Sequence, residues 1–228
     1  LNFQNTDNSK SSTLLSGTIT ITDDIDLSGT GITGLTRDTG YNDPFSGTLS
    51  GGNHTIILAI GEPYGSRKSG DTTTEITDTD TSEGNGKIYR HAYQGLFAKT
   101  GDNAKFENIK ISGKVNLYDY NVGMYIGSLS GMHNSGSINI DNVTVNGTFN
   151  LRRTGTNYTI TRCGGLIGQA KGDSTHNITI NNSTVSPTIT TNVVSGGYYY
   201  TGGAIGEIAS TQENITINAD TVTIGANL

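Results

Sequence analysis

Tryptophan is absent from the 228 residues, cysteine occurs once and proline three times. The single Cys163 excludes an intramolecular disulfide and a zinc site built from several cysteines. So few prolines argue against a flexible proline-rich linker. Lys and Arg number 14 against 20 Asp and Glu, and the net charge of −6 argues against nucleic acid or an anionic membrane as partner. No apolar run reaches the roughly 18 residues of a membrane span, so we expect no membrane insertion.

Glycine is the residue in excess, with 32 copies, about twice the usual share. No stretch has the i, i+3, i+4, i+7 apolar spacing of an amphipathic helix. We therefore expect an all-β chain with tight turns, in one domain over residues 1–228. The chain opens "LNFQNTDNSK", with neither an initiator Met nor an apolar signal segment, and we expect it to be processed or excised from a longer product.

A short glycine phrase recurs along the chain. "CGGLIGQAKG" (163–172) and "TGGAIGEIAS" (201–210) match closely, and "YQGLFAKTG" (93–101) and "VGMYIGSLSG" (122–131) fit more loosely. The best alignment superposes Gly95, Met124, Gly165 and Gly203, at intervals of 29, 41 and 38 residues. Such self-similarity is typical of stacked-coil proteins. We expect the glycines to allow a sharp turn or a close approach of two backbones, and the following apolar pair to fill one layer of core.

After each phrase comes a polar turn and then a strand of alternating apolar and polar residues. The four strands are "FENIKISGKVNL", "INIDNVTVNGTFNL", "ITINNSTVSPTITT" and "ITINADTVTIGANL", and their best-matched apolar positions are Ile111, Val145, Val185 and Val222. The alternation predicts one face in the core and the other in water. Residues 91–228 are therefore predicted to form four stacked coils.

The upstream part follows the same pattern less regularly. "GTITITDDIDLSG" (17–29) and "FSGTLSGGNHTIILAI" (45–60) predict two opening coils within residues 1–60. Residues 61–90 are polar and rich in Gly, Thr and Asp. They are predicted to be a long inserted loop or a small side excursion.

These residues carry a family resemblance. "ITDDIDLSG", then "FSGTLSGGNHTI", "GLFAKTGDNAKFENIKISGKV" and "GGLIGQ", resemble the GLUG-repeat region of bacterial cell-surface, adhesin-like proteins, which also occurs beside IgA-specific metallopeptidase domains. The resemblance covers residues 18–228 apart from the 61–90 insert. It implies a right-handed parallel β-helix (β-solenoid) with a long loop insertion, exported to the cell surface, and it implies no catalytic residue and no cofactor. The HExxH zinc motif of the metallopeptidase is absent from this sequence.

Side chains suited to metal binding are few. No histidine has a second ligand at i+2 to i+4, so we expect solvated turn or strand-edge residues at His54, His91, His133 and His176. Asp78 and Asp80 alternate with Ser82 as in oxygen-rich calcium loops, but the glycine and the carboxylate that an EF-hand requires are missing. We predict no metal site, with Asp78 and Asp80 as weak candidates.

Two other groups bear on chemistry. Asp24 and Asp26 would share the outer face of an opening coil, where paired carboxylates can perform acid–base catalysis. A solvated coil surface is the favoured alternative. Cys163 occupies a slot aligned with Tyr93, Val122 and Thr201, so it is expected to be a small buried hydrophobe and not a reactive thiol.

Eight of the eleven tyrosines lie just before a glycine phrase. Stacked coils would gather them along one edge or face. A flat ring with a polar tip suits protein interfaces and sugars alike, while packing against the core or the coil edge is the alternative. The candidate ligand-binding residues are Tyr118, Tyr120, Tyr198, Tyr199 and Tyr200. Many Asn-X-Ser/Thr sequons also occur, and the sequence leaves open whether any carries a glycan.

Three functions follow as hypotheses. The first is a non-catalytic extracellular β-solenoid module of a surface protein, acting in adhesion to a host or matrix glycan or protein, or as a structural stalk. The second is a self-assembling filament subunit whose partners are neighbouring copies, because open strand edges pair unless they are capped. The third is a polysaccharide-active β-helix enzyme that uses Asp24 and Asp26. We expect the first, and no enzymatic activity.

Overall fold

The structure is a computed structural model that describes residues 15–27, 44–60, 66–69, 72–75, 93–120, 123–154, 160–171, 176–193, 198–209 and 215–225. Almost all of these residues belong to or connect β-strands, and within them only Leu15 and Ser16 are helical. The all-β prediction is therefore confirmed. The described part of the chain contains no apolar helix of membrane-spanning length.

Twelve strands form the largest sheet, sheet I. Its central path runs β1 (Thr18–Thr20), β3 (Thr48–Ser50), β9 (Ala104–Tyr120), β12 (Gly136–Val145), β16 (His176–Asn181) and β21 (Ile215–Asp220). Six further strands pair with these or with one another: β2 (Ile25–Asp26), β4 (Thr55–Ile60), β13 (Thr148–Thr154), β17 (Thr184–Val185), β18 (Thr188–Val193) and β22 (Thr223–Ile224). Every pairing in sheet I is parallel.

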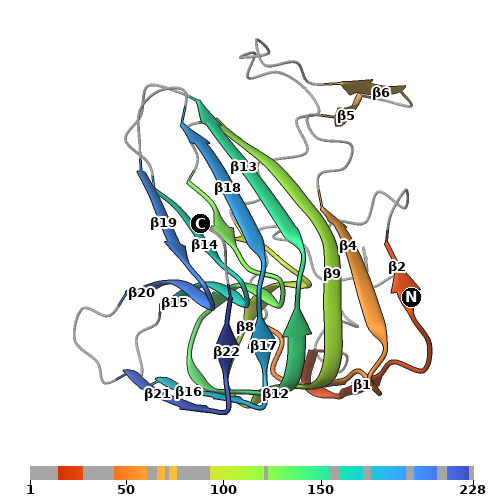
Figure 1. Cartoon of the computed structure of the whole chain (residues 1–228), viewed down its shortest axis with the longest axis vertical. Helices are drawn as coiled ribbons and strands as arrows, with labels where there is room; N and C mark the ends of the chain where they lie inside the picture. The colour runs from red at the N-terminus through yellow and green to blue at the C-terminus, as the bar shows by residue number, and fades with distance from the viewer. Residues whose placement is uncertain are drawn as a thin grey trace.

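Two four-stranded parallel sheets complete the architecture. Sheet II consists of β7 (Tyr93–Gln94), β10 (Tyr125–Ile126), β14 (Ile160–Gly164) and β19 (Tyr198–Gly202). Sheet III consists of β8 (Phe97–Thr100), β11 (Ser130–His133), β15 (Ile167–Lys171) and β20 (Ile205–Ala209). From β7 onward the chain visits sheet II, sheet III and sheet I in that order, and each new passage begins in sheet II beside the strand of the previous one (Figure 1).

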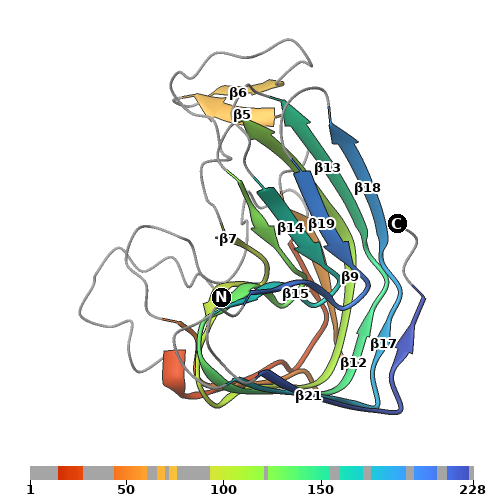
Figure 2. The same cartoon turned by 90° about the vertical axis from the view of Figure 1, so that its left-hand side faces the viewer.

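The three sheets surround one core. Figure 2 shows β15 of sheet III lying opposite β21 of sheet I, and β14 and β19 of sheet II running alongside β13 and β18. One cluster of buried apolar side chains draws on all three sheets, including Phe106 and Ile140 of sheet I, Ile126 of sheet II and Ile167 of sheet III. Burying each such side chain stabilises the fold by roughly 1.5–3 kcal/mol. A one-residue slip would expose every one of them, so burial fixes the register.

The register corrects part of the sequence alignment. Ile111, Val145 and Val185 are direct neighbours as predicted, but the next residue in that column is Ile224. Val222 was therefore misplaced by two positions. Val222 instead packs partly against the core, because the turn before β22 brings it there.

The glycine phrase is also shifted in its second copy. Gly131, Gly168 and Gly206 are neighbours, since the residues flanking them pair directly. Ser128 donates its backbone N–H to the carbonyl of Gly165, so Ser128 holds the position that the alignment gave to Met124. The first phrase has one residue fewer, because Gln94 and Phe97 pair with Ile126 and Ser130.

The expected close approach is present at Gly168. A Cβ at this position would lie 2.3 Å from the backbone nitrogen of Ile126, in sheet II. The glycine therefore lets sheet III pack against the backbone of sheet II. The apolar pair before it, Leu166 and Ile167, is fully buried in the core as predicted.

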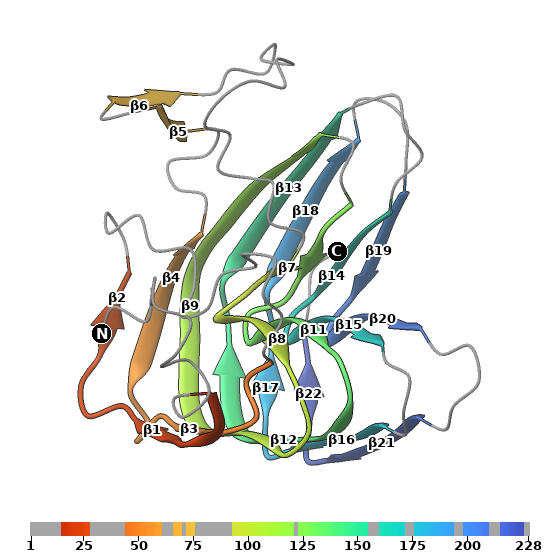
Figure 3. The same ribbon diagram turned by 180° about the vertical axis from the view of Figure 1, so that it is seen from behind.

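The opening residues form strands where two coils were expected, with β1 beside β3 and β2 beside β4. The 61–90 insert contains a small antiparallel hairpin of β5 (Ser66–Ser69) and β6 (Thr72–Glu75). Figure 3 shows this hairpin outside the three parallel sheets. The insert is thus a side excursion in this part of its length.

Candidate functional site

Two columns of side chains meet where sheet II joins sheet III. The parallel register of sheet II places Tyr93, Tyr125, Arg162 and Tyr200 in one column. The register of sheet III places Lys99, Met132, Gln169 and Glu207 in the other. Each column takes one residue from each of four neighbouring strands, so residues 32 to 38 positions apart in the sequence become direct neighbours. We call these eight residues the corner site.

The sheet II column is a stack of rings and cations. The rings of Tyr93 and Tyr125 stack with centroids 4.8 Å apart and an angle of 22° between their planes. The guanidinium of Arg162 lies 4.8 Å from the Tyr125 centroid and 6.0 Å from that of Tyr200, and Lys99 Nζ lies 4.3 Å from the Tyr93 centroid. Each cation–π contact of this kind contributes roughly 0.5–1 kcal/mol or more as it is desolvated. The stack thus holds Arg162 in a fixed orientation.

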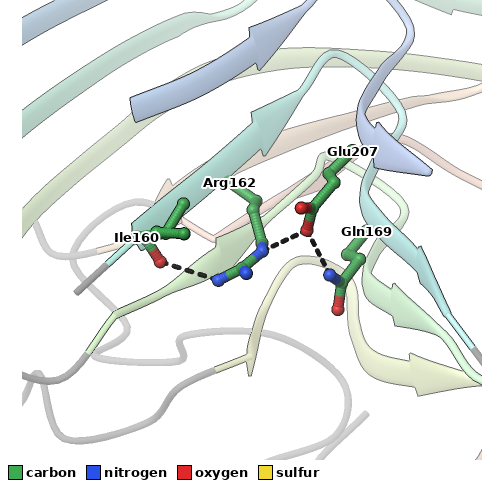
Figure 4. Close-up of polar contacts among 4 residues, drawn as sticks. All are labelled: Ile160, Arg162, Gln169 and Glu207. Atoms are coloured by element: carbon green, nitrogen blue, oxygen red, sulfur yellow. Dashed lines mark hydrogen bonds and ion pairs between the residues drawn. The ribbon is translucent and has the colours of Figure 1, made fainter. Parts of the chain in front are cut away.

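Arg162 and Gln169 converge on one carboxylate. Arg162 Nε and Gln169 Nε2 both donate to Oε2 of Glu207, while Arg162 Nη1 donates to the carbonyl of Ile160 at 2.9 Å (Figure 4). The side chains of Arg162 and Glu207 are mostly buried. Removing either charge would therefore leave the other poorly solvated.

One atom of this cluster lacks a partner. Gln169 is 2% exposed, and its Oε1 accepts no hydrogen bond from any described residue. Glu207 fixes the orientation of the amide, because the opposite orientation would place Oε1 against a carboxylate oxygen. Figure 4 shows Oε1 pointing away from Glu207. A buried acceptor without a donor costs about 1–3 kcal/mol, so Oε1 lowers the stability of this cluster.

The predicted tyrosines divide between two sheets. Tyr198 and Tyr200 on β19 are 58% and 41% exposed, and Tyr199 between them packs partly against the core. Tyr118 and Tyr120 lie on β9 in sheet I, beside Arg152 and Thr154 of β13. The structure therefore brings Tyr200 into the corner site and leaves Tyr118 and Tyr120 on another sheet.

Asp24 has a structural partner. Its carboxylate accepts the Thr55 backbone N–H at 2.7 Å and lies 3.5 Å from His54 Nδ1. This backbone hydrogen bond is the main reason that the pKa of Asp24 is lowered. Asp26 lies two residues on, in β2, and is also exposed.

The remaining candidates differ from one another. Cys163 is buried in the core as expected, and burial raises the pKa of its thiol. Its column runs Gln94, Ile126, Cys163 and Thr201, so the alignment with Thr201 is confirmed and those with Tyr93 and Val122 were wrong. His133 is also fully buried, which contradicts the expected solvated position. Asp78 and Asp80 lie outside the described residues. Within the described ranges no group of three His, Cys, Asp or Glu side chains is placed to hold a metal ion.

Sequence reasoning missed six of the eight corner-site residues: Lys99, Tyr125, Met132, Arg162, Gln169 and Glu207. The signal was present in the glycine phrases, because Gln169 and Glu207 directly follow the matched Gly168 and Gly206. Comparison of the chain with family models, curated proteins and solved structures finds no match. The resemblance to GLUG-repeat regions stays a prediction.

Proposed function

We propose that the parallel sheets form a right-handed parallel β-helix and that the chain is a non-catalytic module of an extracellular surface protein that acts in adhesion. The order in which the chain visits sheets II, III and I supports a solenoid. A solenoid supplies a rigid scaffold on which side chains from successive coils form a continuous surface. A stalk function uses the same scaffold without a ligand.

The observation that carries the binding function is the pair of exposed rings of Tyr198 and Tyr200 beside the Arg162–Glu207 ion pair. Arg162 and Glu207 next to these rings offer charged hydrogen-bonding groups that remain partly exposed. Tyr125 has Tyr93 against its ring and Arg162 over it, so Tyr200 and Tyr198 supply the exposed aromatic surface. A hydroxyl-rich partner such as a glycan fits this chemistry.

The test is a screen of the purified chain on a glycan array and on host-matrix proteins. We expect a Tyr198→Ala/Tyr200→Ala variant and a Gln169→Met variant to lose binding at least tenfold. Lys171→Ala is the matched control, because Lys171 is exposed at the end of β15, the strand that carries Gln169, and it should bind normally. Urea unfolding of each variant checks that the fold is retained.

The two parts of the proposal fail separately. If the unmodified chain binds nothing on either panel, adhesion is wrong and the stalk function remains. If it binds and Gln169→Met and the tyrosine variant bind equally well, the ligand lies elsewhere than the corner site.

Self-assembly is a second candidate with its own observation. The large apolar side chains that are exposed among the described residues are Tyr198, Tyr200, Ile208, Ile217 and Ile224, and all lie on β19, β20, β21 or β22. Exposed edge strands with apolar side chains tend to pair with other chains. Light scattering over a concentration series tests this, with Ile208→Lys/Ile224→Lys expected to reduce any association and Thr184→Lys, on an exposed polar position, as control. A constant monomer mass at high concentration excludes it.

A further inference from the structure

His133 lies at the end of β11, at the corner where sheet III leads into β12 of sheet I. It is 0% exposed. Its Nε2 lies 3.2 Å from the carbonyl oxygen of Gly136, and its Nδ1 lies 3.2 Å from Oγ1 of Thr100, its register neighbour on β8. Both ring nitrogens are therefore within hydrogen-bond distance of an oxygen.

The hydrogen-bonded chain continues beyond Thr100. Thr100 Oγ1 lies 3.2 Å from Ser130 Oγ, which lies 2.9 Å from the carbonyl oxygen of Met132. This hydrogen-bond network thus contains four bonds, with a backbone carbonyl at each end and His133, Thr100 and Ser130 between them. All three side chains are buried.

Counting protons decides the charge of the ring. A carbonyl oxygen only accepts, and a hydroxyl has one proton to donate. Ser130 donates its proton to Met132, so Thr100 must donate to Ser130, and Nδ1 must then donate to Thr100. Nε2 must donate to Gly136 as well. Four bonds need four protons and the two hydroxyls supply two, so the ring must carry two.

We infer that His133 is an imidazolium in the folded protein, and that its deprotonation breaks one bond of this buried chain and loosens the corner between β11 and β12. A neutral imidazole carries a single ring proton, so it leaves one of the four bonds unmade. This assigns a proton-sensitive element to a position that the sequence placed at the surface.

Among the charged groups near the ring, the carboxylate of Asp102 favours the cation. Asp102 follows β8, and its pKa is lowered chiefly by the Ser137 N–H and to a smaller extent by the charge of His133. Lys99 on β8 lies over the Tyr93 ring, and Lys171 on β15 is exposed. On β12, residues 136–140 carry no charge, and His176 on β16 pairs with Gly136 through the backbone. The nearby anion offsets part of the cost of a buried cation.

The sign of the pH dependence follows. A ring that binds its proton more tightly in the folded state adds stability at pH values below the ordinary histidine value of about 6.5. That contribution is lost as the pH rises through the folded-state midpoint. The free energy of unfolding should therefore fall as the pH rises above about 6.5.

The direct test is nitrogen-15 NMR of the ring nitrogens in the full 228-residue chain labelled at histidine, between pH 5 and pH 9. His133→Gln assigns the signals by their loss. We expect both ring nitrogens of His133 to be protonated at pH 7. In Ser130→Ala the Thr100 hydroxyl no longer donates to Ser130 and can donate to Nδ1 instead. A neutral ring then completes every remaining hydrogen bond of the network. The ring should therefore bind its second proton about tenfold more weakly.

Ser128→Ala is the matched control. Ser128 is equally buried, and its hydroxyl donates to the carbonyl of Gly165, which takes no part in the His133 hydrogen-bond network. The midpoint of the His133 titration should therefore not move. A neutral ring protonated only at Nε2 at pH 6.5 in the unmodified protein overturns the inference. An unchanged midpoint in folded Ser130→Ala does the same, and if that variant does not fold, the spectrum of the unmodified chain decides alone.

Discussion

At the scale of the residue, a column of left-handed positions runs along one corner of sheet I. Asn53, Asn108, Asn142 and Asn182 all have φ between 50° and 66°, and the register makes them neighbours. Asn142 Nδ2 donates to Asn108 Oδ1 at 2.7 Å. Asparagine tolerates this conformation, and its amide links successive strands. The column therefore explains part of the asparagine richness of the sequence.

Thr221 ends the column with φ of 52°. A β-branched residue is strained in this region by about 1–2 kcal/mol. We expect Thr221→Asn to raise the free energy of unfolding by about 1 kcal/mol, measured by urea denaturation. Thr223→Asn, two residues on in β22, is the control and should bring no gain. Equal effects of the two substitutions would contradict the strain argument.

At the scale of the element, the contact between sheets II and III depends on Gly168. A Cβ there would meet backbone atoms of Ile126, Gly131 and Tyr125 at 2.3–2.7 Å, and backbone cannot move aside as a side chain can. We expect Gly168→Ala to lower the free energy of unfolding by about 3 kcal/mol. Gly225→Ala is the control, since its nearest neighbour is the Ser186 side chain at 3.0 Å. A Gly168→Ala variant as stable as the unmodified protein would show that the sheets are not packed so closely.

Asp102, in the turn between β8 and β9, forms a hydrogen bond with the start of β12. Its carboxylate accepts the N–H of Ser137 at 2.7 Å, which is the main reason that its pKa lies below the ordinary value of 3.8. The folded protein therefore gains stability from this carboxylate above about pH 4, and loses it as the pH falls through the lowered pKa.

In Asp102→Asn the free energy of unfolding should fall less steeply as the pH is lowered, because an amide does not titrate and its oxygen still accepts the Ser137 N–H. Urea unfolding midpoints measured between pH 2 and pH 5 check it. Because Asp102 is exposed, solvent screens the effect and we expect a small one. If the stability of the variant falls with pH as steeply as that of the unmodified protein, the acid sensitivity belongs to other carboxylates, such as Glu107, whose pKa is also lowered.

The strands were predictable from local pattern, and their register was not. Alternation in "HNITINN" predicted that Ile178 and Ile180 face inward, and both are buried. The alignment of the glycine phrases was wrong at Met124. Several glycines lie close together in the sequence there, so different alignments match almost equally well, and only the hydrogen bonds between strands show which one is correct. His133 was missed because its partner Thr100 lies 33 residues away, beyond any local search. Arg162 and Glu207, 45 residues apart, were missed for the same reason.

At the scale of the whole molecule, one core runs through all three sheets and each strand pairs mainly with its counterparts in the preceding and following passages. Stability in such an arrangement is close to a sum over passages and the contacts between neighbours. The corner site and the buried His133 chain each draw on several passages. Both therefore depend on the stacking of passages and not on any single strand.

The spacing of neighbouring strands also sets how the molecule would respond to tension. Gly131, Gly168 and Gly206 are neighbours in sheet III, and Val145, Val185 and Ile224 in sheet I, which gives 37 to 40 residues for each of the last two passages. Pulling on the two ends should peel off one passage at a time, since each is held only by the next. Single-molecule stretching should then show steps of about 130 Å for these passages, so that extension under load proceeds in discrete increments.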